Sequence, residues 1–339
     1  MSKVKYLKTV NFEKIRLELL RGPRLNNLME HFEDIASLKK QIPISEVTPL
    51  QNFLQSKINL EYYQVFKKNC GPFFNHAMAS IPYALEEHCR VSVAINRYAQ
   101  YKIKEAKESP KEPLKFYELS AADGTNARTL GEFSKGLVKT LSDTPNQANY
   151  ENFVNLLTHK HSFIYKGPFV NITKEYLSAH RDLALFAKGF DIILEPLVFQ
   201  MYGKKRKEPI AYMRRLLKED GLFFFMEKLL QKDEDEYNRR EELKDTFFKN
   251  QYFSPKQIDD KKINILSEMR QGQVTLDMLL SGIKANFRYA WMIWNSANFY
   301  EIVASDSFEN IDLFMSLIDD PYVPDKFLCD KNLTMKRVL

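Results

Sequence analysis

The sequence predicts an α/β fold in which a doubly wound, mostly parallel sheet of seven strands carries helices on both faces. Short apolar runs of strand length alternate with helical patterns from residue 114 onwards, and this alternation implies βαβ crossovers. A run of small residues follows the first strand and leads into a helix. In the first third of the chain, by contrast, apolar residues recur only at helical spacing.

The elements of this sheet can be placed along the chain, with the last strand expected to run antiparallel to the others. The expected strands are residues 114–119, 137–141, 162–165, 191–194, 222–226, 289–294 and 298–305. The expected helices between the early strands begin at Asn126 or cover 147–157, 173–188 and 208–219. Asp220-Gly221 is expected to turn the chain into the fifth strand.

We expect three parts in the chain. A helical N-terminal appendage comprises residues 1–110, because the following boundary segment is rich in Lys, Glu and Pro. The sheet domain, 111–306, contains a helical, strongly charged insertion at 231–286, which we expect to act as a lid. Residues 307–339 form a C-terminal extension. Residues 1–60 could cover the site or serve a partner.

The composition indicates a cytoplasmic globular protein. Of the 339 residues 44% are hydrophobic, enough for a substantial core, but no apolar run approaches the ~20 residues that span a bilayer. We expect no signal peptide and no membrane association. Three cysteines, an odd number, fit a reducing compartment. His159 and His161 lack a third ligand at a suitable spacing, so no metal is expected.

The charge distribution gives little support to nucleic-acid binding. The net charge is +6, but Lys and Arg are scattered among acidic residues rather than gathered in a stripe. The one dense basic run, 204–207, is expected in a solvated loop before a helix. Nucleic-acid contact is therefore less favoured than a solvated surface. A homodimer stays open, because the aromatic-rich final strands could pair two subunits.

The segment after the first strand has the pattern of a nucleotide cradle. The strand ends near Glu118, and Ser120 and Ala122 occupy positions where glycines are usual, with Asp123 and Gly124 next. Small residues let the backbone approach a ligand, and a helix N-terminus offers unpaired N–H groups. This pattern favours a nucleotide site at the carboxyl end of a parallel strand. The alternative is a plain strand-to-helix turn.

Two further residues follow the second and third strands. Asp143, expected in the loop after the second strand, could bind a ribose diol. Phe169, after Gly167-Pro168, could flank an adenine ring. In the alternative interpretation Asp143 caps a helix and Phe169 fills the core.

The cradle, Asp143 and the segments 190–195, 216–221 and 223–228, in this order along the chain, resemble the motifs of class I S-adenosylmethionine-dependent methyltransferases over about residues 115–305. The resemblance implies a Rossmann-like methyltransferase fold and S-adenosylmethionine as cofactor. The cofactor-binding residues that it implies are Tyr83, Glu118, Ser120, Ala122, Asp123, Gly124, Asp143, Phe169 and Glu195.

A closer likeness is to the carboxy-S-adenosylmethionine synthase branch. Residues 80–83 before a long helix, 198–201 after the fourth strand and 294–299 between the final strands are similar to segments of that branch. The branch's carboxylate-binding arginine is not matched, because the best-matching position holds Lys262, which offers charge but no bidentate fork. Ordinary methyl donation is therefore the expectation.

The first hypothesis is a methyltransferase that transfers a methyl group to a small molecule or modified nucleoside by in-line displacement in a lidded pocket. Glu227 and Glu195 are the candidate catalytic groups, with purely structural roles as the alternative. The candidate substrate contacts in the insertion are Tyr237, Arg240, Tyr252 and Lys262. Two rivals remain: a carboxy-S-adenosylmethionine-type enzyme of tRNA wobble modification, favoured if Lys261 or Lys262 points at the cofactor, and a non-catalytic cofactor-binding regulatory or assembly subunit.

Overall fold

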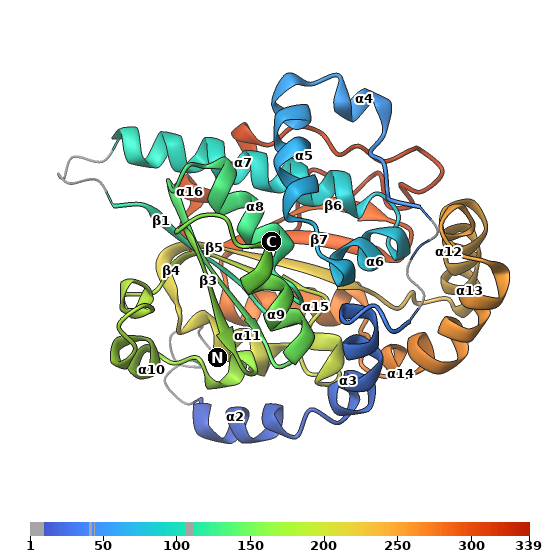
Figure 1. Cartoon of the computed structure of the whole chain (residues 1–339), viewed down its shortest axis with the longest axis horizontal. Helices are drawn as coiled ribbons and strands as arrows, with labels where there is room; N and C mark the ends of the chain where they lie inside the picture. Colours follow the sequence, from blue (N-terminus) through green and yellow to red (C-terminus); the bar gives the residue numbers. More distant parts are fainter. Residues whose placement is uncertain (1–9, 41–42, 44, 106–111) are drawn as a thin grey trace.

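The computed structural model describes residues 10–40, 43, 45–105 and 112–339. Its centre is an eight-stranded sheet in the order β3-β2-β1-β4-β5-β7-β6-β8 (Figure 1). The strands are β1 (Leu114–Glu118), β2 (Val138–Thr144), β3 (Ser162–Lys166), β4 (Phe190–Pro196), β5 (Leu217–Lys228), β6 (Tyr289–Ser296), β7 (Phe299–Ser305) and β8 (Lys336–Arg337). The first five pair in parallel, and β7 pairs antiparallel with both β5 and β6. The α/β class and the antiparallel last strand of the predicted seven are therefore confirmed.

Two details of the predicted sheet were wrong. An eighth strand, β8, comes from the C-terminal extension and pairs antiparallel with β6; its two residues are too short to give a periodic signal. The fifth strand begins at Leu217, five residues before the predicted start, and Asp220-Gly221 lies inside it. The pairing with β4 shifts register there, so the turn signal marks an irregularity within the strand rather than its beginning.

The buried strands pack helices on both faces because their side chains alternate between the two sides. On β5, Phe223 and Phe225 stack on each other with ring centroids 4.3 Å apart and belong to one apolar cluster, whereas Phe224 belongs to another. The clusters are covered by helices from both the N-terminal and the sheet segments. These helices are α2 (Phe12–Leu20), α7 (Ala84–Glu105), α8 (Thr125–Phe133), α10 (Lys174–Ala179), α11 (Lys207–Arg214), α15 (Leu276–Asn286) and α16 (Phe308–Leu317).

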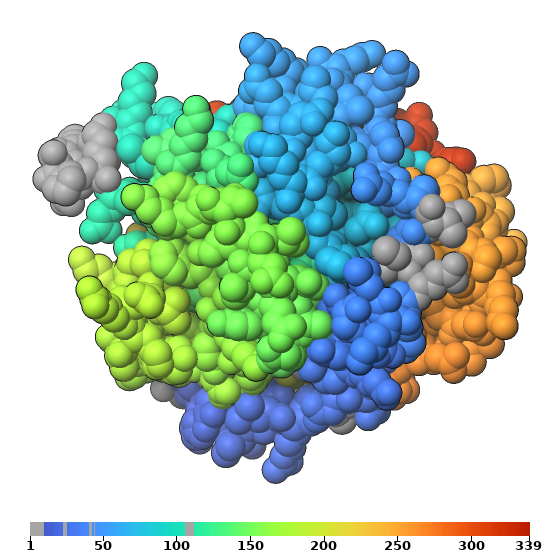
Figure 2. Space-filling model, viewed as in Figure 1, coloured from blue at the N-terminus to red at the C-terminus, as the bar shows by residue number. Residues whose placement is uncertain are grey.

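The N-terminal helices share their core with the sheet. Ile15 and Leu19 of α2 lie in the same cluster as Phe223, and Val91 of α7 lies in the cluster that holds Phe224. In the space-filling view the blue N-terminal segments run between the green helices of the sheet domain and the orange insertion (Figure 2). The expected boundary near residue 110 is thus not a boundary in packing.

The remaining helices gather near the carboxyl ends of the parallel strands (Figure 1). The expected helix at 173–188 is only the short α10 followed by a 3₁₀ turn, η2 (Ala184–Phe186). The N-terminal helices near the carboxyl ends of the strands are α3 (Pro23–Ala36), α4 (Gln51–Leu54), α5 (Lys57–Asn69) and α6 (Pro72–Ser80). The sheet domain adds α9 (Gln147–Leu156). The insertion is helical as predicted and comprises α12 (Glu234–Phe247), η4 (Lys249–Gln251), α13 (Pro255–Lys261), η5 (Lys262–Leu266), α14 (Ser267–Arg270) and α15.

In the part of the chain that the structure describes, no helix combines the length and apolar character that a bilayer crossing requires.

The return of the insertion to the sheet domain depends on close backbone packing at Gly272. A Cβ atom there would overlap the carbonyl oxygen of Gln200, in the loop after β4. We therefore expect Gly272→Ala to lower the free energy of unfolding by about 1–3 kcal/mol, the usual cost of overpacking, in urea denaturation. Gln271→Ala, at the exposed neighbouring position, should stay within about 0.5 kcal/mol of the parent. Equal stability of the two variants would contradict this close packing.

Candidate active site

A cavity of about 220 Å³ lies at the carboxyl ends of β1, β2, β4 and β5. This is the edge where ligands bind in doubly wound sheets. Its roof comes from α3, α6 and the insertion, so of the described residues up to 60 those of α3 contribute to the cover. Asn27 of α3 donates a hydrogen bond to Glu268 of α14 (3.3 Å), which joins two parts of the roof.

Glu118, the last residue of β1, lines this cavity and is 1% exposed. Its carboxylate accepts hydrogen bonds from the Asn126 side chain (3.4 Å) and from the Ala127 N–H (3.2 Å). Burial raises its pKa to about 8. Among the described residues no cationic nitrogen lies within 4.0 Å of it. A buried carboxyl without a cationic partner suits a ligand that brings its own positive charge.

The cradle after Glu118 keeps a left-handed backbone although glycines are missing. Ser120 has φ 42° and Ala122 has φ 50°, and Gly124 follows with φ 67°. Ser120 and Ala122 line the cavity. Left-handed non-glycine residues cost about 1–3 kcal/mol each and cluster at functional sites. A plain strand-to-helix turn would not need this strain, so the geometry favours the cradle interpretation.

Asp123 does not line the cavity but joins the cradle to its roof. Its carboxylate accepts hydrogen bonds from the backbone N–H of Phe74 in α6 (3.0 Å) and from the Thr125 hydroxyl (2.6 Å). Gly71 permits this approach, because a Cβ atom there would overlap the Asp123 carboxylate. Asp123 therefore holds α6 over the sheet edge.

Asp143 lies within β2 rather than in the loop after it, and it is fully buried. Its carboxylate accepts hydrogen bonds from the Tyr117 hydroxyl (2.7 Å) and from the Ser120 N–H (2.8 Å). Burial raises its pKa to about 7. The residues after it, Thr144 and Pro145, line the cavity instead. In this structure Asp143 therefore supports the cradle from behind and presents no carboxylate to a ribose.

Phe169 and Tyr83 also lie outside the cavity wall. Phe169 is fully buried and packs edge-on against Tyr202, with ring centroids 5.1 Å apart, which matches the core interpretation. Tyr83, itself left-handed with φ 61°, packs against Phe248 and Phe327. Of residues 80–83, Ser80 and Ile81 reach the cavity.

The two candidate catalytic carboxyls form a buried ion-pair cluster below the cavity. Arg206 contacts both oxygens of Glu227, at 3.1 Å between Nη2 and Oε2, and both side chains are at most 1% exposed. Glu195 accepts the backbone N–H groups of Val198 and Phe199. Burial and the adjacent Glu227 raise the pKa of Glu195 well above its ordinary value.

Neither Glu227 nor Glu195 lines the cavity. Their partners are those expected of a structural role, and a catalytic role for them stays a prediction. Arg206 corrects the interpretation of the basic run 204–207, because its guanidinium is buried rather than solvated.

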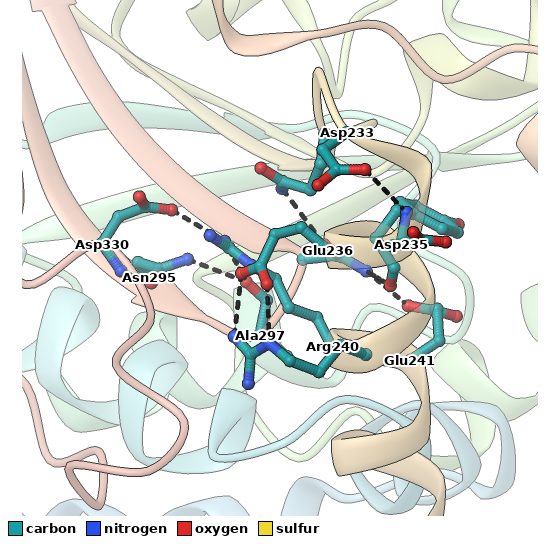
Figure 3. A network of polar contacts seen from close by, with 12 residues as sticks. Asp233, Asp235, Glu236, Arg240, Glu241, Asn295, Ala297 and Asp330 are labelled. Atoms are coloured by element: carbon teal, nitrogen blue, oxygen red, sulfur yellow. Dashed lines mark hydrogen bonds and ion pairs between the residues drawn. The ribbon is translucent and has the colours of Figure 1, made fainter.

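None of the four expected substrate contacts of the insertion lines the cavity. Arg240 is bound by Glu236, Asp330 and the Ala297 carbonyl, and it fastens α12 to the turn between β6 and β7 (Figure 3). Tyr237 donates its hydroxyl to Gln273 (3.0 Å). Tyr252 packs on Phe248, and Lys262 is exposed.

The insertion contributes lysines to the cavity that the sequence analysis did not identify. Lys244, Lys249 and Lys261 line it together with Lys228 of β5. Lysines recur every few residues along helices with low apolar content, and this spacing does not indicate that the lysine amines converge.

Three histidines also line the cavity: His31, His76 and His88. Burial lowers the pKa of His31 and His88 to about 4, and that of His76 lies well below its ordinary value. His76 Nε2 lies 2.7 Å from Lys261 Nζ, and its Nδ1 has no partner among the described residues. These imidazoles are neutral near pH 7. The structure shows no group of three or more metal-binding side chains within its described ranges.

Comparisons with known proteins give weak likenesses. No family model and no curated protein matches the chain. The plantazolicin methyltransferase BpumL, in complex with a monoazolic desmethylPZN analog and SAH, is 9% identical with a TM-score of 0.46, over 84% of this chain and 99% of that chain. A putative O-methyltransferase from Klebsiella pneumoniae is 11% identical with a TM-score of 0.41, over 73% and 90%. Because such TM-scores lie below 0.5, we base neither the fold nor the function on them.

The Arg206–Glu227 pair yields a test of structural against catalytic roles. Arg206→Met leaves a buried carboxylate uncompensated, so we expect a loss of about 3–5 kcal/mol in the free energy of unfolding. Adding Glu227→Gln to that variant should restore part of the loss. The control is Lys205→Met, because Lys205 is 67% exposed in its surface pair with Glu18; its effect should be under about 1 kcal/mol. Unchanged stability of Arg206→Met in urea denaturation would contradict the structural role.

Proposed function

We propose that this protein is an S-adenosylmethionine-dependent methyltransferase acting on a small molecule or modified nucleoside. The observation that carries the proposal is Glu118, a buried carboxyl with no cationic nitrogen of the described residues within 4.0 Å, beside a cradle held in the left-handed conformation. The weak similarity to solved methyltransferases agrees with it but adds no weight. A cavity of about 220 Å³ suits a small acceptor better than a polymer.

In this proposal the cofactor supplies, when bound, an electrophilic methyl group on a positively charged sulfur. Glu118 would accept a hydrogen bond from the cofactor's cationic amino-acid portion, and the backbone of residues 120–122 would approach its nucleoside. Asp143 would keep the cradle's Ser120 N–H in place rather than bind the ribose itself. The roof helices would exclude water, and the neutral His76 or His88 could take a proton from the acceptor.

A second candidate function rests on one observation. Lys261 lines the cavity and binds no carboxylate among the described residues, which would favour a carboxy-S-adenosylmethionine-type enzyme if its amine faces the bound cofactor. Lys262, the position matched from the sequence, is exposed. The carboxy form of the cofactor would then place its negative group at Lys261.

Cofactor binding is the first prediction of this proposal. Heat-denatured, freshly purified protein should release an adenosyl compound on mass spectrometry, and its mass separates the ordinary from the carboxy cofactor. Calorimetric titration should show that Glu118→Gln weakens S-adenosylmethionine binding at least tenfold, since a hydrogen bond to a charged group contributes about 1.5–3 kcal/mol. Glu175→Gln changes an exposed carboxylate and should leave the affinity unchanged. No binding to the parent protein at millimolar cofactor would refute the proposal.

The pKa of Glu118 gives a second prediction. Burial raises it to about 8, so below that pH the free protein carries a neutral carboxyl that must lose its proton to bind a cation. Affinity for S-adenosylmethionine should therefore rise as the pH increases from 6 to 8. Titrations at constant ionic strength test this. The Glu118→Gln variant should lose most of the dependence; a parent protein whose affinity is flat or falls over this range would show that Glu118 does not face the cofactor's charge.

A further inference from the structure

Four lysine side chains, one from the end of β5 and three from the insertion, line the same cavity. Lys228 extends from the end of β5, Lys244 from α12, Lys249 from η4 and Lys261 from the end of α13, and all four line the cavity. The side chains of the first three are 1–3% exposed. Amines of this kind are almost never buried unless they are paired.

The pairing that the protein supplies is incomplete. Lys228 and Lys244 share one carboxylate oxygen of Glu241, each at 2.6 Å. Lys244 and Lys249 share one oxygen of Asp245, at 3.5 and 3.0 Å. Two carboxylates, Glu241 and Asp245, thus pair with three lysine ammonium groups, not including Lys261.

Lys261 adds a fourth amine without a counter-ion. Its Nζ lies 2.7 Å from His76 Nε2 and 2.7 Å from Ser80 Oγ, and in the described parts of the chain no carboxylate lies within 4.0 Å of it. Burial and the other three lysines lower the pKa of Lys261 well below its ordinary value. Burial also lowers the pKa of Lys249 to about 8. The cluster therefore lacks negative charge, which a ligand can provide.

The rest of the roof is mostly apolar, apart from His31, His76 and Ser80. The residues from α3, α6, η5 and α14 that line it include Met29, Phe32, Phe73, Ile265, Leu266 and Met269. Glu118 lies on the sheet side of the same cavity. The cavity thus offers a carboxylate at the sheet edge, lysines on the insertion and an apolar wall.

From this arrangement we propose that the acceptor substrate is an organic anion, with a carboxylate or phosphate group among Lys228, Lys244, Lys249 and Lys261 and an apolar body against α3 and α6. The inference rests on the proposed methyltransferase function only in assigning the anion the role of methyl acceptor. The anion site itself is inferred from the positions of the four lysines. The four amines come from separate elements, so the anion would also hold the insertion closed over the cavity.

The test measures binding of matched eight-carbon probes: octanoate, octyl phosphate, octanol and octylamine. Each is titrated into the parent protein by calorimetry, alone and with saturating S-adenosylhomocysteine. We expect at least one of the two anions to bind at least tenfold more tightly than octanol, and octylamine to bind no better than octanol. Preference for octanoate would identify a carboxylate acceptor, and preference for octyl phosphate a phosphate.

The variants are Lys261→Met and Lys249→Met, with Lys262→Met as the matched control. Lys262 is the next residue along the chain, but it is exposed and does not line the cavity. We expect either cavity variant to weaken anion binding at least tenfold, while Lys262→Met stays within twofold. Thermal unfolding checks that each variant is folded. If a cavity variant fails to fold, the comparison of the anions with octanol on the parent protein still tests whether the cavity prefers an anion.

Three results would overturn the inference. The first is equal affinity of the parent for the anions and octanol, and the second is an equal loss in Lys262→Met and Lys261→Met. The third is competition between the anion and S-adenosylhomocysteine, which would assign the lysines to the cofactor. Failure of the methyltransferase proposal looks different: S-adenosylhomocysteine does not bind, whereas the anions still bind alone.

Discussion

The left-handed cradle between β1 and α8 is the constraint on which the site depends, and Asp143 maintains it. Without glycine at positions 120 and 122, this conformation is unfavourable and persists only where the surroundings over-determine it. The Ser120 N–H and the Tyr117 hydroxyl both bind the Asp143 carboxylate, so β1, β2 and the cradle are fastened at one point. Asp123 then fastens α6 to the same segment. One short loop thus positions the floor of the cavity and part of its roof.

The roof is attached through buried charges rather than through apolar packing alone. Arg206 binds Glu227 on β5 and the carbonyl of Gly272 (3.0 Å), where the insertion returns. Arg240 ties α12 to the turn between β6 and β7. Such pairs contribute little net stability compared with apolar residues, but breaking one is costly. They fix where the insertion lies on the sheet edge, and this fixed geometry brings its lysines over the cavity.

The sequence was sufficient to predict the α/β class and seven of the eight strands, because the apolar runs of these strands and the helices between them have clear periods. It also located the cradle, since small residues after a strand are a local signal. It did not predict which side chains face the cavity. Glu195 and Glu227 lie at strand ends, as candidate acids should, yet Glu227 binds Arg206, Glu195 accepts the N–H groups of Val198 and Phe199, and neither lines the cavity. The lysines were not predicted because their convergence depends on how α12, η4 and α13 fold back over the cavity. No local sequence pattern encodes this packing.

The placement of charged side chains in the cavity constrains where the cofactor and the acceptor of a methyl transfer can bind. A cationic cofactor is favoured near Glu118 and disfavoured near the four lysines, so its positive portion is directed toward Glu118. An anionic acceptor has the opposite preference. The two reactants would therefore be sorted to different parts of one small cavity. Once the methyl group has left, the sulfur is neutral and the product carries one positive charge fewer, so the Glu118 carboxylate attracts it less. The same electrostatics that selects the bound orientation would then favour release of the spent cofactor.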